Sequence, residues 1–344
     1  MKTIFVYLGF ALSAILLWLI ARRIDFARTV EIVLKIDRSY LILSIFFFSL
    51  TICFRAVRWR YLIAVKPPIP LGALLSATSI GLMINNILPI RMGEVARAYL
   101  IAKKAQVSPV TALATLAVER IFDVLCLLSI LGFYLRAMRG SQVERAGLRI
   151  GLFGVLFLVL LVGGILTIYF ASVRRLWVES LLNRTLGKRF PGISRQLFTV
   201  FSKAIDGFSA LRGWSQLLPV LLFTICLWLA GVSSYYFLMR AFSFPLGFSS
   251  ALLVLVIVAF GVAVPSAPGY AGTFHAACIL GLSLVGLQNQ TMAASYAFTL
   301  HATEWASSTA LGFFFFWSEG LSWKAICEQS EERQVIRPNA SLPV

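Results

Sequence analysis

Charged residues are scarce in this chain of 344 residues: they make up 13% of it, against 59% hydrophobic residues. So small a polar fraction cannot cover the surface of a water-soluble domain, and the mean hydropathy of +0.87 agrees. The composition therefore predicts an integral membrane protein. Acidic residues are the scarcest charges, 14 against 31 lysines and arginines. Because the bases lie between apolar segments, they fit inner loops beside lipid headgroups, and no nucleic-acid partner is expected.

Several signatures of other protein classes are missing as well. The five cysteines form no CxxC pair, so neither a disulfide framework nor a zinc site is predicted. GxxxxGK[ST] and HExxH are also absent, and we expect no metal, no cofactor, no catalytic residue and no enzyme activity. The apolar run 3–21 has no small-x-small cleavage site before Arg22, which predicts an uncleaved first transmembrane helix.

Long apolar runs dominate the chain. Those long enough to span a bilayer lie at about 3–21, 40–62, 109–135, 149–170, 216–240 and 290–318. Two further segments, 70–104 and 247–287, are interrupted by prolines and glycines. We predict an all-α polytopic membrane protein with about six full transmembrane helices and two re-entrant helical hairpins. The alternative is that each piece of the interrupted segments is a separate, tilted span.

The distribution of basic residues predicts the orientation. With both termini cytoplasmic and each hairpin returning to its side of entry, 20 bases lie inside and 10 outside, as the positive-inside rule favours for a multi-pass protein of the cytoplasmic (inner) membrane. The two hairpins then open from opposite sides, which makes an inverted-topology repeat. The predicted parts of the single membrane domain 1–344 are a first helix with an outer loop (1–39), repeat 1 (40–137), a connecting helix with a basic amphipathic segment (138–215), repeat 2 (216–318) and a short cytoplasmic tail (319–344). The amphipathic segment suits either a helix in the headgroup region or a solvated linker helix.

Arginines follow the interruption of the first segment. Arg91, Glu94 and Arg97 are three apart, so a helix would place them on one face. A helix that begins after Pro89, with arginines near its N-terminus, can bind phosphate. Asn85 precedes the break, as does Asn86. We expect both asparagines to cap it or to touch a lipid headgroup.

Three ionisable residues lie in the next span: Glu119, Arg120 and Asp123. Charge is costly in a bilayer and faces a cavity or a partner. Two interpretations remain. These residues form a structural ion-pair network that fixes the hairpin to this span, since buried charges in lipid are usually paired, or they bind the substrate.

The second interruption carries glycine and histidine in place of arginine. Its candidate substrate-binding residues are Pro268, Gly269, Tyr270, Gly272, His275, His301 and Glu304. We expect Pro268 and Gly269 to end one half-helix, and the glycines to let backbone N–H groups approach a ligand. His301 and Glu304 are three apart and placed to pair. An intramembrane histidine can serve a proton-coupled step, and a packing role through hydrogen bonds is the alternative.

These residues resemble a known family. The pattern N-N-x-x-P-x-R-x-G-E-x-x-R, followed in the next span by E-R-x-x-D, resembles the transmembrane flippase-like domain of the lysylphosphatidylglycerol synthase (multiple peptide resistance factor) family. In this chain it reads Asn85, Asn86, Pro89, Arg91, Gly93, Glu94, Arg97, Glu119, Arg120 and Asp123. The second signature, P-x-x-P-G-G-x-G-x-x-E, is matched at Pro265, Pro268, Gly269 and Gly272, with Tyr270 where glycine is usual and His275 where glutamate is usual.

The resemblance covers roughly 40–318 and implies a stand-alone, lipid-translocating membrane domain with inverted re-entrant repeats. The family's soluble aminoacyl-transfer domain has no counterpart in this sequence, so synthase activity is not expected. The leading hypothesis is a flippase or flippase-like transporter for an anionic or polyprenyl-linked envelope lipid. The alternatives are a non-transporting partner or regulator of an envelope lipid or glycan synthase, and a membrane-embedded lipid-modifying enzyme. The partners considered are the membrane lipid itself, a second copy of the chain, and envelope-lipid biosynthetic enzymes.

Overall fold

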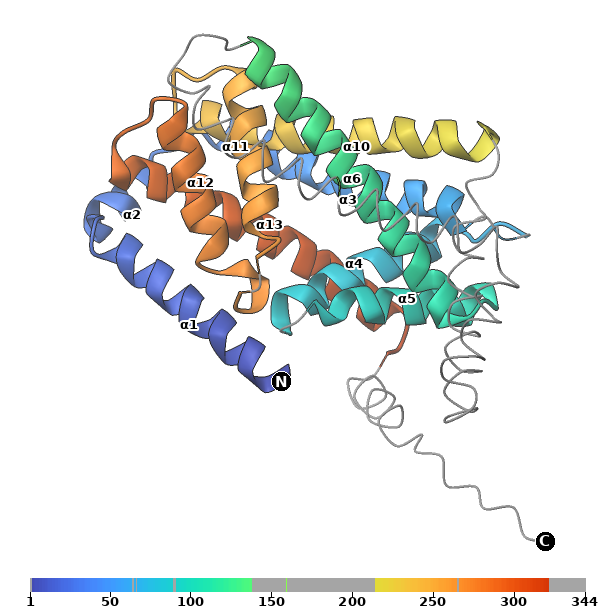
Figure 1. Cartoon of the computed structure of the whole chain (residues 1–344). Coiled ribbons are helices and arrows are strands. Elements are labelled where there is room, and N and C mark those ends of the chain that lie inside the picture. Colours follow the sequence, from blue (N-terminus) through green and yellow to red (C-terminus); the bar gives the residue numbers. More distant parts are fainter. Residues whose placement is uncertain are drawn as a thin grey trace, which may run out of the picture.

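The computed structural model describes residues 2–137, apart from 64, 66, 89 and 90, together with 159, 214–264 and 266–321. Every element in these ranges is helical, which confirms the all-α prediction. The α-helices are α1 (Lys2–Ala21), α2 (Phe26–Leu34), α3 (Arg38–Ile63), α4 (Leu71–Ile87), α5 (Met92–Ala105), α6 (Pro109–Ala137), α10 (Trp214–Ala241), α11 (Phe248–Gly261), α12 (Thr273–Leu284) and α13 (Gln290–Ser318), with the 3-10 turn η3 (Pro268–Tyr270) between α11 and α12 (Figure 1). The predicted span 149–170, the amphipathic segment and most of the tail lie outside the described residues.

In the described part of the chain, fewer helices are long and apolar enough to cross a membrane than the five full spans predicted there. The helices α3 and α10, of 26 and 28 residues, are long and apolar enough to cross a membrane. The helices α1 and α2 qualify as a third span only when they are counted together, and they meet at an angle of 85°. The helices α6 and α13 have 29 residues each but carry the polar and charged site residues. By length and composition, the described residues therefore contain two or three spans.

The first interrupted segment forms a helical hairpin of α4 and α5. Leu88 ends α4 with an extended backbone, as the following proline favours. Gly81 on α4 faces Gly93 on α5 so closely that a Cβ added to Gly93 would lie 1.8 Å from the Gly81 carbonyl oxygen. Gly93 also faces Asn85, one turn later in α4, and Gly81 faces Arg97, one turn later in α5, so the two helices are antiparallel. With 17 and 14 residues and a rise of about 1.5 Å per residue, neither helix covers a hydrocarbon core of ~30 Å.

The second interrupted segment forms a hairpin of α11 and α12. Gly261 on α11 faces Ala277 on α12, and Val254 faces Gly281, so these helices are also antiparallel. The break between them is longer than the sequence predicts. The helix α11 already ends at Gly261 rather than at Pro268, and Pro268 lies in the 3-10 turn of the connection that follows it.

The two halves of the chain have separate apolar cores. One buried cluster is built mainly on α3, α4, α5 and α6, and the other on α10, α11, α12 and α13 with the end of α6. The helices α3 and α10 pack along each other, and α13 runs diagonally from α2 and α12 to α4 (Figure 1). At Gly312 the approach of α13 to α4 is so close that a Cβ would lie 2.3 Å from the Met83 Cβ. The helix α13 therefore joins the second half to the first hairpin.

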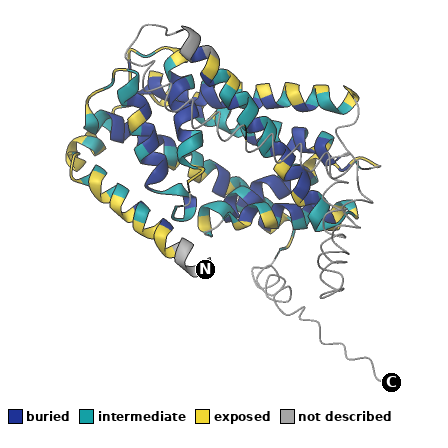
Figure 2. Cartoon of the chain, in the orientation of Figure 1, coloured by how far each residue is buried: buried dark blue, intermediate teal, exposed yellow. Residues whose placement is uncertain are grey.

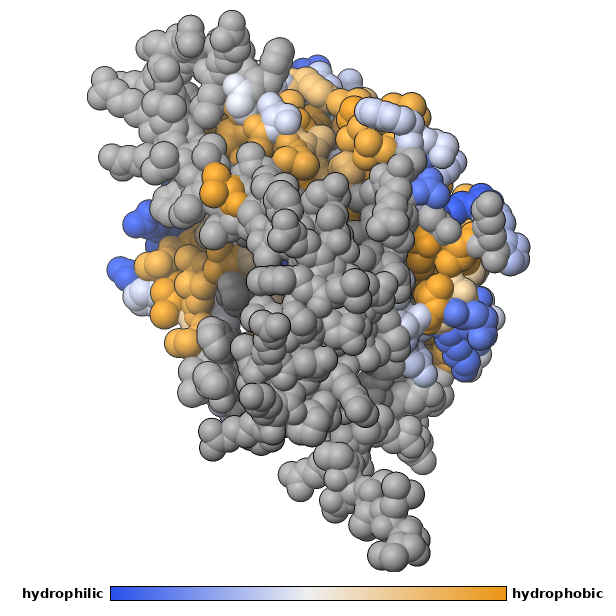
Figure 3. All heavy atoms as spheres, turned by 45° about the vertical axis from the view of Figure 1, so that its right-hand side comes forward, coloured by the Kyte–Doolittle hydropathy of each residue, from blue (hydrophilic) through white to orange (hydrophobic). Residues whose placement is uncertain are grey.

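The described surface is largely apolar, as a membrane requires. The helix α1 lies along the outside and exposes most of its length (Figure 2), including Trp18 at 56% and Ile15 at 54%. Apolar side chains also cover broad areas of the described surface in the space-filling view (Figure 3). Exposed apolar patches of this kind are what lipid-facing helices present.

Candidate functional site

Glu119 on α6 is the centre of a buried group of charges. Its Oε1 lies 3.1 Å from Arg97 Nη1 on α5, 3.2 Å from Arg55 Nη1 and 3.2 Å from Arg58 Nη2, both on α3. The side chains of Glu119 and Arg58 are fully buried. One carboxylate thus joins three helices through three arginines. Because an unpaired buried charge is strongly destabilising, this carboxylate fixes the first hairpin against α3 and α6.

A second carboxylate extends this group toward the surface. Asp123 Oδ1 accepts from Arg58 Nη1 at 2.7 Å, and its Oδ2 accepts from Arg120 Nη1 at 3.3 Å. The Nη2 of Arg120 lies 3.2 Å from Glu94 Oε1 on α5, and the side chains of Arg120 and Glu94 are 38% and 28% exposed. Arg58 Nη1 also donates to the Thr224 hydroxyl on α10. The buried pairs therefore continue into an accessible edge.

We call this set the ion cluster: Arg55, Arg58, Glu94, Arg97, Glu119, Arg120 and Asp123. It contains four arginines and three carboxylates, so it carries one positive charge in excess. Several of its buried atoms have no hydrogen-bond partner among the described residues, namely Nε and Nη2 of Arg58 and of Arg97, Arg120 Nε and Glu119 Oε2. The Arg97 guanidinium lies 3.9 Å from the centre of the Trp59 ring, which covers its face, and of its nitrogens only Nη1 is paired, with Glu119. Both the charge and the free donors favour an anion.

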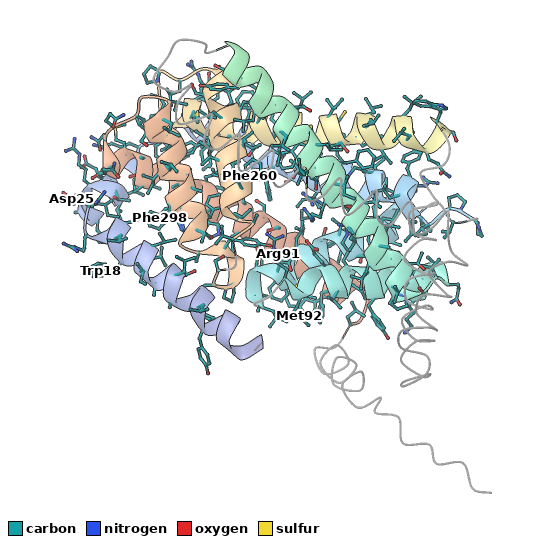
Figure 4. The ribbon with its side chains drawn as sticks, viewed as in Figure 1. Trp18, Asp25, Arg91, Met92, Phe260 and Phe298 are labelled. Carbon is teal, nitrogen blue, oxygen red and sulfur yellow. The ribbon has the colours of Figure 1, made fainter. Side chains whose placement is uncertain are left out.

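Arg91 lies apart from the ion cluster. It precedes the first residue of α5, in a left-handed conformation with φ 52°, so it does not share a helical face with Glu94 and Arg97 as the spacing predicted. Its Nη2 donates to the Val262 carbonyl oxygen at 2.6 Å, and its guanidinium lies 5.6 Å from the centre of the Tyr270 ring. Figure 4 places Arg91 at the centre of the molecule, between the start of α5 and the connection of the second hairpin. Arg91 therefore bridges the two hairpins.

The two asparagines before the break have different partners. Asn85 Oδ1 accepts from the Gly93 N–H at 2.8 Å, so Asn85 caps α5 from the preceding helix. Asn86 does not cap the break. Its Nδ2 donates to the Ser308 and Thr309 hydroxyls, both at 2.9 Å, and so fixes the end of α4 to the middle of α13.

The histidines of the second half hydrogen-bond to each other. His275 Nδ1 accepts from the Gly272 N–H at 3.3 Å, and His275 Nε2 lies 3.3 Å from His301 Nδ1. His301 Nε2 lies 2.7 Å from the Gly269 carbonyl oxygen. His275 is the third residue of α12, where a side chain that accepts from the N-cap N–H forms half of a capping box. The N-cap residue is Gly272, which has no side chain, so the second hydrogen bond of a capping box is missing.

The predicted pair of His301 and Glu304 does not form. His301 uses both ring nitrogens for Gly269 and His275. The Glu304 carboxylate has no hydrogen bond or ion pair with another described residue. In addition, the described residues contain no group of three or more His, Cys, Asp or Glu side chains that could hold a metal ion.

The ends of the two hairpins meet. A Cβ on Gly269 would lie 3.4 Å from the Asn86 carbonyl oxygen and 3.3 Å from the ring of Trp305. Ser13 on α1 supports the same connection, because its hydroxyl accepts from the Ala267 N–H at 2.9 Å. Thus Arg91, Asn86 and the Gly269 connection come together at one place. The accessible edge of the ion cluster begins one turn further along α5, at Glu94, whose N–H donates to the Arg91 carbonyl oxygen at 3.1 Å.

Two members of the ion cluster were missed from the sequence. Arg55 and Arg58 lie near the end of a predicted span, where they were counted as bases of an inner loop. The two arginines are three residues apart in a helix that continues to Ile63, and this spacing could have indicated that they share one helical face. Arg91, which the spacing grouped with Glu94 and Arg97, is not part of the ion cluster, whereas these two arginines are.

An all-helical chain with membrane-grade helices and buried charges between them is a polytopic membrane protein. The chain belongs to the family described as lysylphosphatidylglycerol synthase TM region, whose model matches residues 6–312. It is 24% identical over 268 residues to the UPF0104 membrane protein PH1989 of Pyrococcus horikoshii, an alignment that covers 74% of this chain and 78% of that protein. No solved structure matches.

Proposed function

We propose that this chain moves a lipid with an anionic headgroup, of the phospholipid or polyprenyl-phosphate kind, across the cytoplasmic membrane without changing it covalently. The observation that supports the proposal is that the ends of the two hairpins meet at one place. There Arg91 joins the hairpins through the Val262 carbonyl, beside an ion cluster with one excess positive charge. Membership of a family named for a lipid synthase's membrane region supports a lipid as the substrate.

In this proposal the hairpins are re-entrant and enter from opposite leaflets, with both termini in the cytoplasm. Their order supports an inverted repeat: α3, α4–α5 and α6 in the first half correspond to α10, α11–α12 and α13 in the second. Short hairpin helices whose ends meet inside the membrane are a known way to form a polar site at its midplane. The headgroup would pass this place while the acyl chains remain in lipid.

The arginines differ in what they offer a headgroup. Arg97 and Arg58 are buried and hold the helices together. Arg91 makes one hydrogen bond to a backbone carbonyl and is not in an ion pair with another described residue. A phosphate can replace that carbonyl and gain a charge-assisted, bidentate contact, so Arg91 is the proposed first contact. The accessible Arg120 is the second.

The test is lipid movement in proteoliposomes, followed with fluorescent lipids of anionic and zwitterionic headgroups. The wild type is compared with Arg91→Ala and with Arg60→Ala, which removes an exposed arginine of α3 as the matched control. Loss of a charge-assisted contact is expected to lower the rate for anionic lipids about tenfold or more in Arg91→Ala only. Equal rates for all three proteins and all headgroups contradict the proposal. A new covalent lipid product favours a lipid-modifying enzyme instead.

A further inference from the structure

The two histidines form a line of three hydrogen bonds whose direction is fixed at both ends. The line runs from the Gly272 N–H through His275 and His301 to the Gly269 carbonyl oxygen. A backbone N–H can only donate and a carbonyl oxygen can only accept. His275 Nδ1 must therefore be an acceptor, and His301 Nε2 must carry a hydrogen. With both rings neutral, the His275 Nε2–H donates to His301 Nδ1, and every polar atom of the line is satisfied.

A further proton has no place in this line. Three contacts need three hydrogens, and Gly272, His275 and His301 supply one each. A fourth hydrogen puts two donors face to face in one of the three contacts, whichever ring nitrogen takes it. Binding a proton therefore breaks at least one hydrogen bond of the line.

The line closes a strained turn. Gly269, Tyr270 and Gly272 all have positive φ, at 65°, 60° and 89°, and Tyr270 is not a glycine. Such conformations persist where the surroundings hold them. The ends of the line bond Gly269 and Gly272, one on each side of Tyr270, so the neutral histidines hold the turn from α12 and α13.

We propose that the His275–His301 pair is a proton-binding site that controls the connection of the second hairpin. The neutral pair holds the turn at Gly269–Gly272 closed against Asn86 and Arg91. One proton bound by the pair breaks the line, releases the turn and separates the ends of the two hairpins. The link to lipid movement rests on the proposed function, and the proton site itself does not.

The immediate surroundings of the pair are mostly aromatic and apolar. Aromatic rings pack on it: Phe274 lies 4.7 Å from the His301 ring and Phe298 lies 4.4 Å from the His275 ring, centre to centre. The sequence of α11 has no ionisable residue. The ionisable or charged groups on the elements packed around the pair include Glu304 and Tyr296 on α13, Cys278 on α12, Tyr235, Tyr236 and Arg240 on α10, Asp25, Arg28 and Glu31 on α2 and at its start, Tyr7 on α1, and Arg91 and Tyr270 at the meeting point of the hairpins.

Glu304 is the group that competes with this assignment. It lies one turn after His301 on α13, and its carboxylate has no partner among the described residues. It can bind a proton itself or stabilise a protonated His301. A variant at Glu304 must therefore accompany the histidine variants.

The chain has only two histidines, which allows a direct test. Protein labelled with 15N-histidine, purified without a histidine tag and placed in lipid bilayers, is followed by solid-state NMR from about pH 8 to about pH 5. At high pH both rings are expected to carry their hydrogen on Nε2 only. As the pH falls, one proton is expected to enter the pair, with loss of the coupling between His275 and His301. A hydrogen on Nδ1 of either ring at high pH, or rings that titrate independently, overturns the proposal.

Hydrogen exchange of the peptide around 262–272 tests whether the proton releases the turn. The wild type is compared at each pH with His301→Gln, whose amide can donate to Gly269 and binds no proton. Loss of one hydrogen bond is expected to speed exchange about fivefold in the wild type at low pH relative to this variant. An equal pH response in both proteins overturns the proposal.

Lipid movement in proteoliposomes is then measured at the same pH values. The wild type is expected to be about fivefold faster at low pH than at high pH, whereas His301→Gln and His275→Asn lose this dependence. Glu304→Gln is expected to keep it. If the dependence disappears in Glu304→Gln alone, the proton site is at Glu304 and the proposal fails. A wild type that moves lipid equally at all pH values contradicts the histidine control alone, and one that moves no lipid at any pH contradicts the proposed function.

Discussion

The two hairpins have similar shapes but are held in different ways. The first, α4–α5, is fixed by charge: Glu119 and Asp123 on α6 bind arginines of α3 and α5. The second, α11–α12, is held by neutral hydrogen bonds through two histidines, and α11 and α12 contain no Asp, Glu, Lys or Arg. Arg91 crosses from one to the other.

This difference indicates a division of labour. An arginine–carboxylate cluster keeps its charge over the physiological pH range and is costly to open, so the first hairpin suits a fixed part of the site. Histidine changes its charge in that range, so the second hairpin suits a part that moves. The following changes test this comparison.

The largest effect is expected from removal of the central carboxylate. Glu119→Ala leaves Arg55, Arg58 and Arg97 without their shared partner, and it should lower the free energy of unfolding by about 3–5 kcal/mol. Unfolding in detergent measures the change. A loss below ~1 kcal/mol would show that charge does not hold the first hairpin.

The crossing of α4 and α5 gives the next effect. Gly93→Ala puts a Cβ 1.8 Å from the Gly81 carbonyl oxygen, so the helices must separate, at a cost of about 1–3 kcal/mol. Gly132→Ala on α6 is the matched control, because no atom lies within 4 Å of its Cβ position. The control should be neutral or slightly stabilising. Equal effects of both changes would contradict the close crossing.

A smaller effect is expected where the first hairpin meets α13. Asn86→Ala removes two hydrogen bonds, to Ser308 and Thr309, and should cost about 1–2 kcal/mol. A double-mutant cycle with Thr309→Val separates the pair's own energy from the effect of truncation. Strict additivity of the two changes would indicate that this bond contributes nothing.

The smallest effect is expected at the exposed pair of Glu31 and Lys35 on α2. Their side chains are 61% and 71% exposed, and such pairs add little to stability. Glu31→Gln should leave the unfolding transition unchanged, in contrast to Glu119→Ala. A clear destabilisation would mean that the exposed pair contributes to stability as the buried ion pairs do, so that burial does not decide the contribution.

The sequence predicted that the chain is helical and that two apolar segments are interrupted, because prolines, glycines and apolar runs act locally. It did not predict the helix α2 within the expected outer loop, or the early end of α11 at Gly261. It also identified Glu119, Arg120 and Asp123 as a group, since one helix carries them. It placed Arg91 wrongly, because helical spacing was extended to a residue that precedes the helix. An arginine gives no indication in the sequence that its backbone adopts the left-handed conformation seen before α5.

Contacts between distant segments were the least predictable. Asn86 was expected to cap its own break, but its partners lie more than 200 residues away on α13. The pairing of His301 with His275 instead of Glu304 depends on how α12 meets α13. Local spacing indicates which residues share a face, and it does not tell which other helix that face meets. The predicted substrate-binding roles of all these residues stay predictions.

The central claim is that the ends of the hairpins meet at Asn86 and Gly269 and must separate for lipid to pass. Cysteines at these two positions, in a background without the native cysteines, can be joined by a short thiol-specific linker that reduction cleaves. The account predicts that linking lowers lipid movement well below that of each single-cysteine variant treated alike, and that reduction restores it to the rate of the unlinked double-cysteine variant. Failure to link the pair, or full lipid movement in the linked protein, would contradict it.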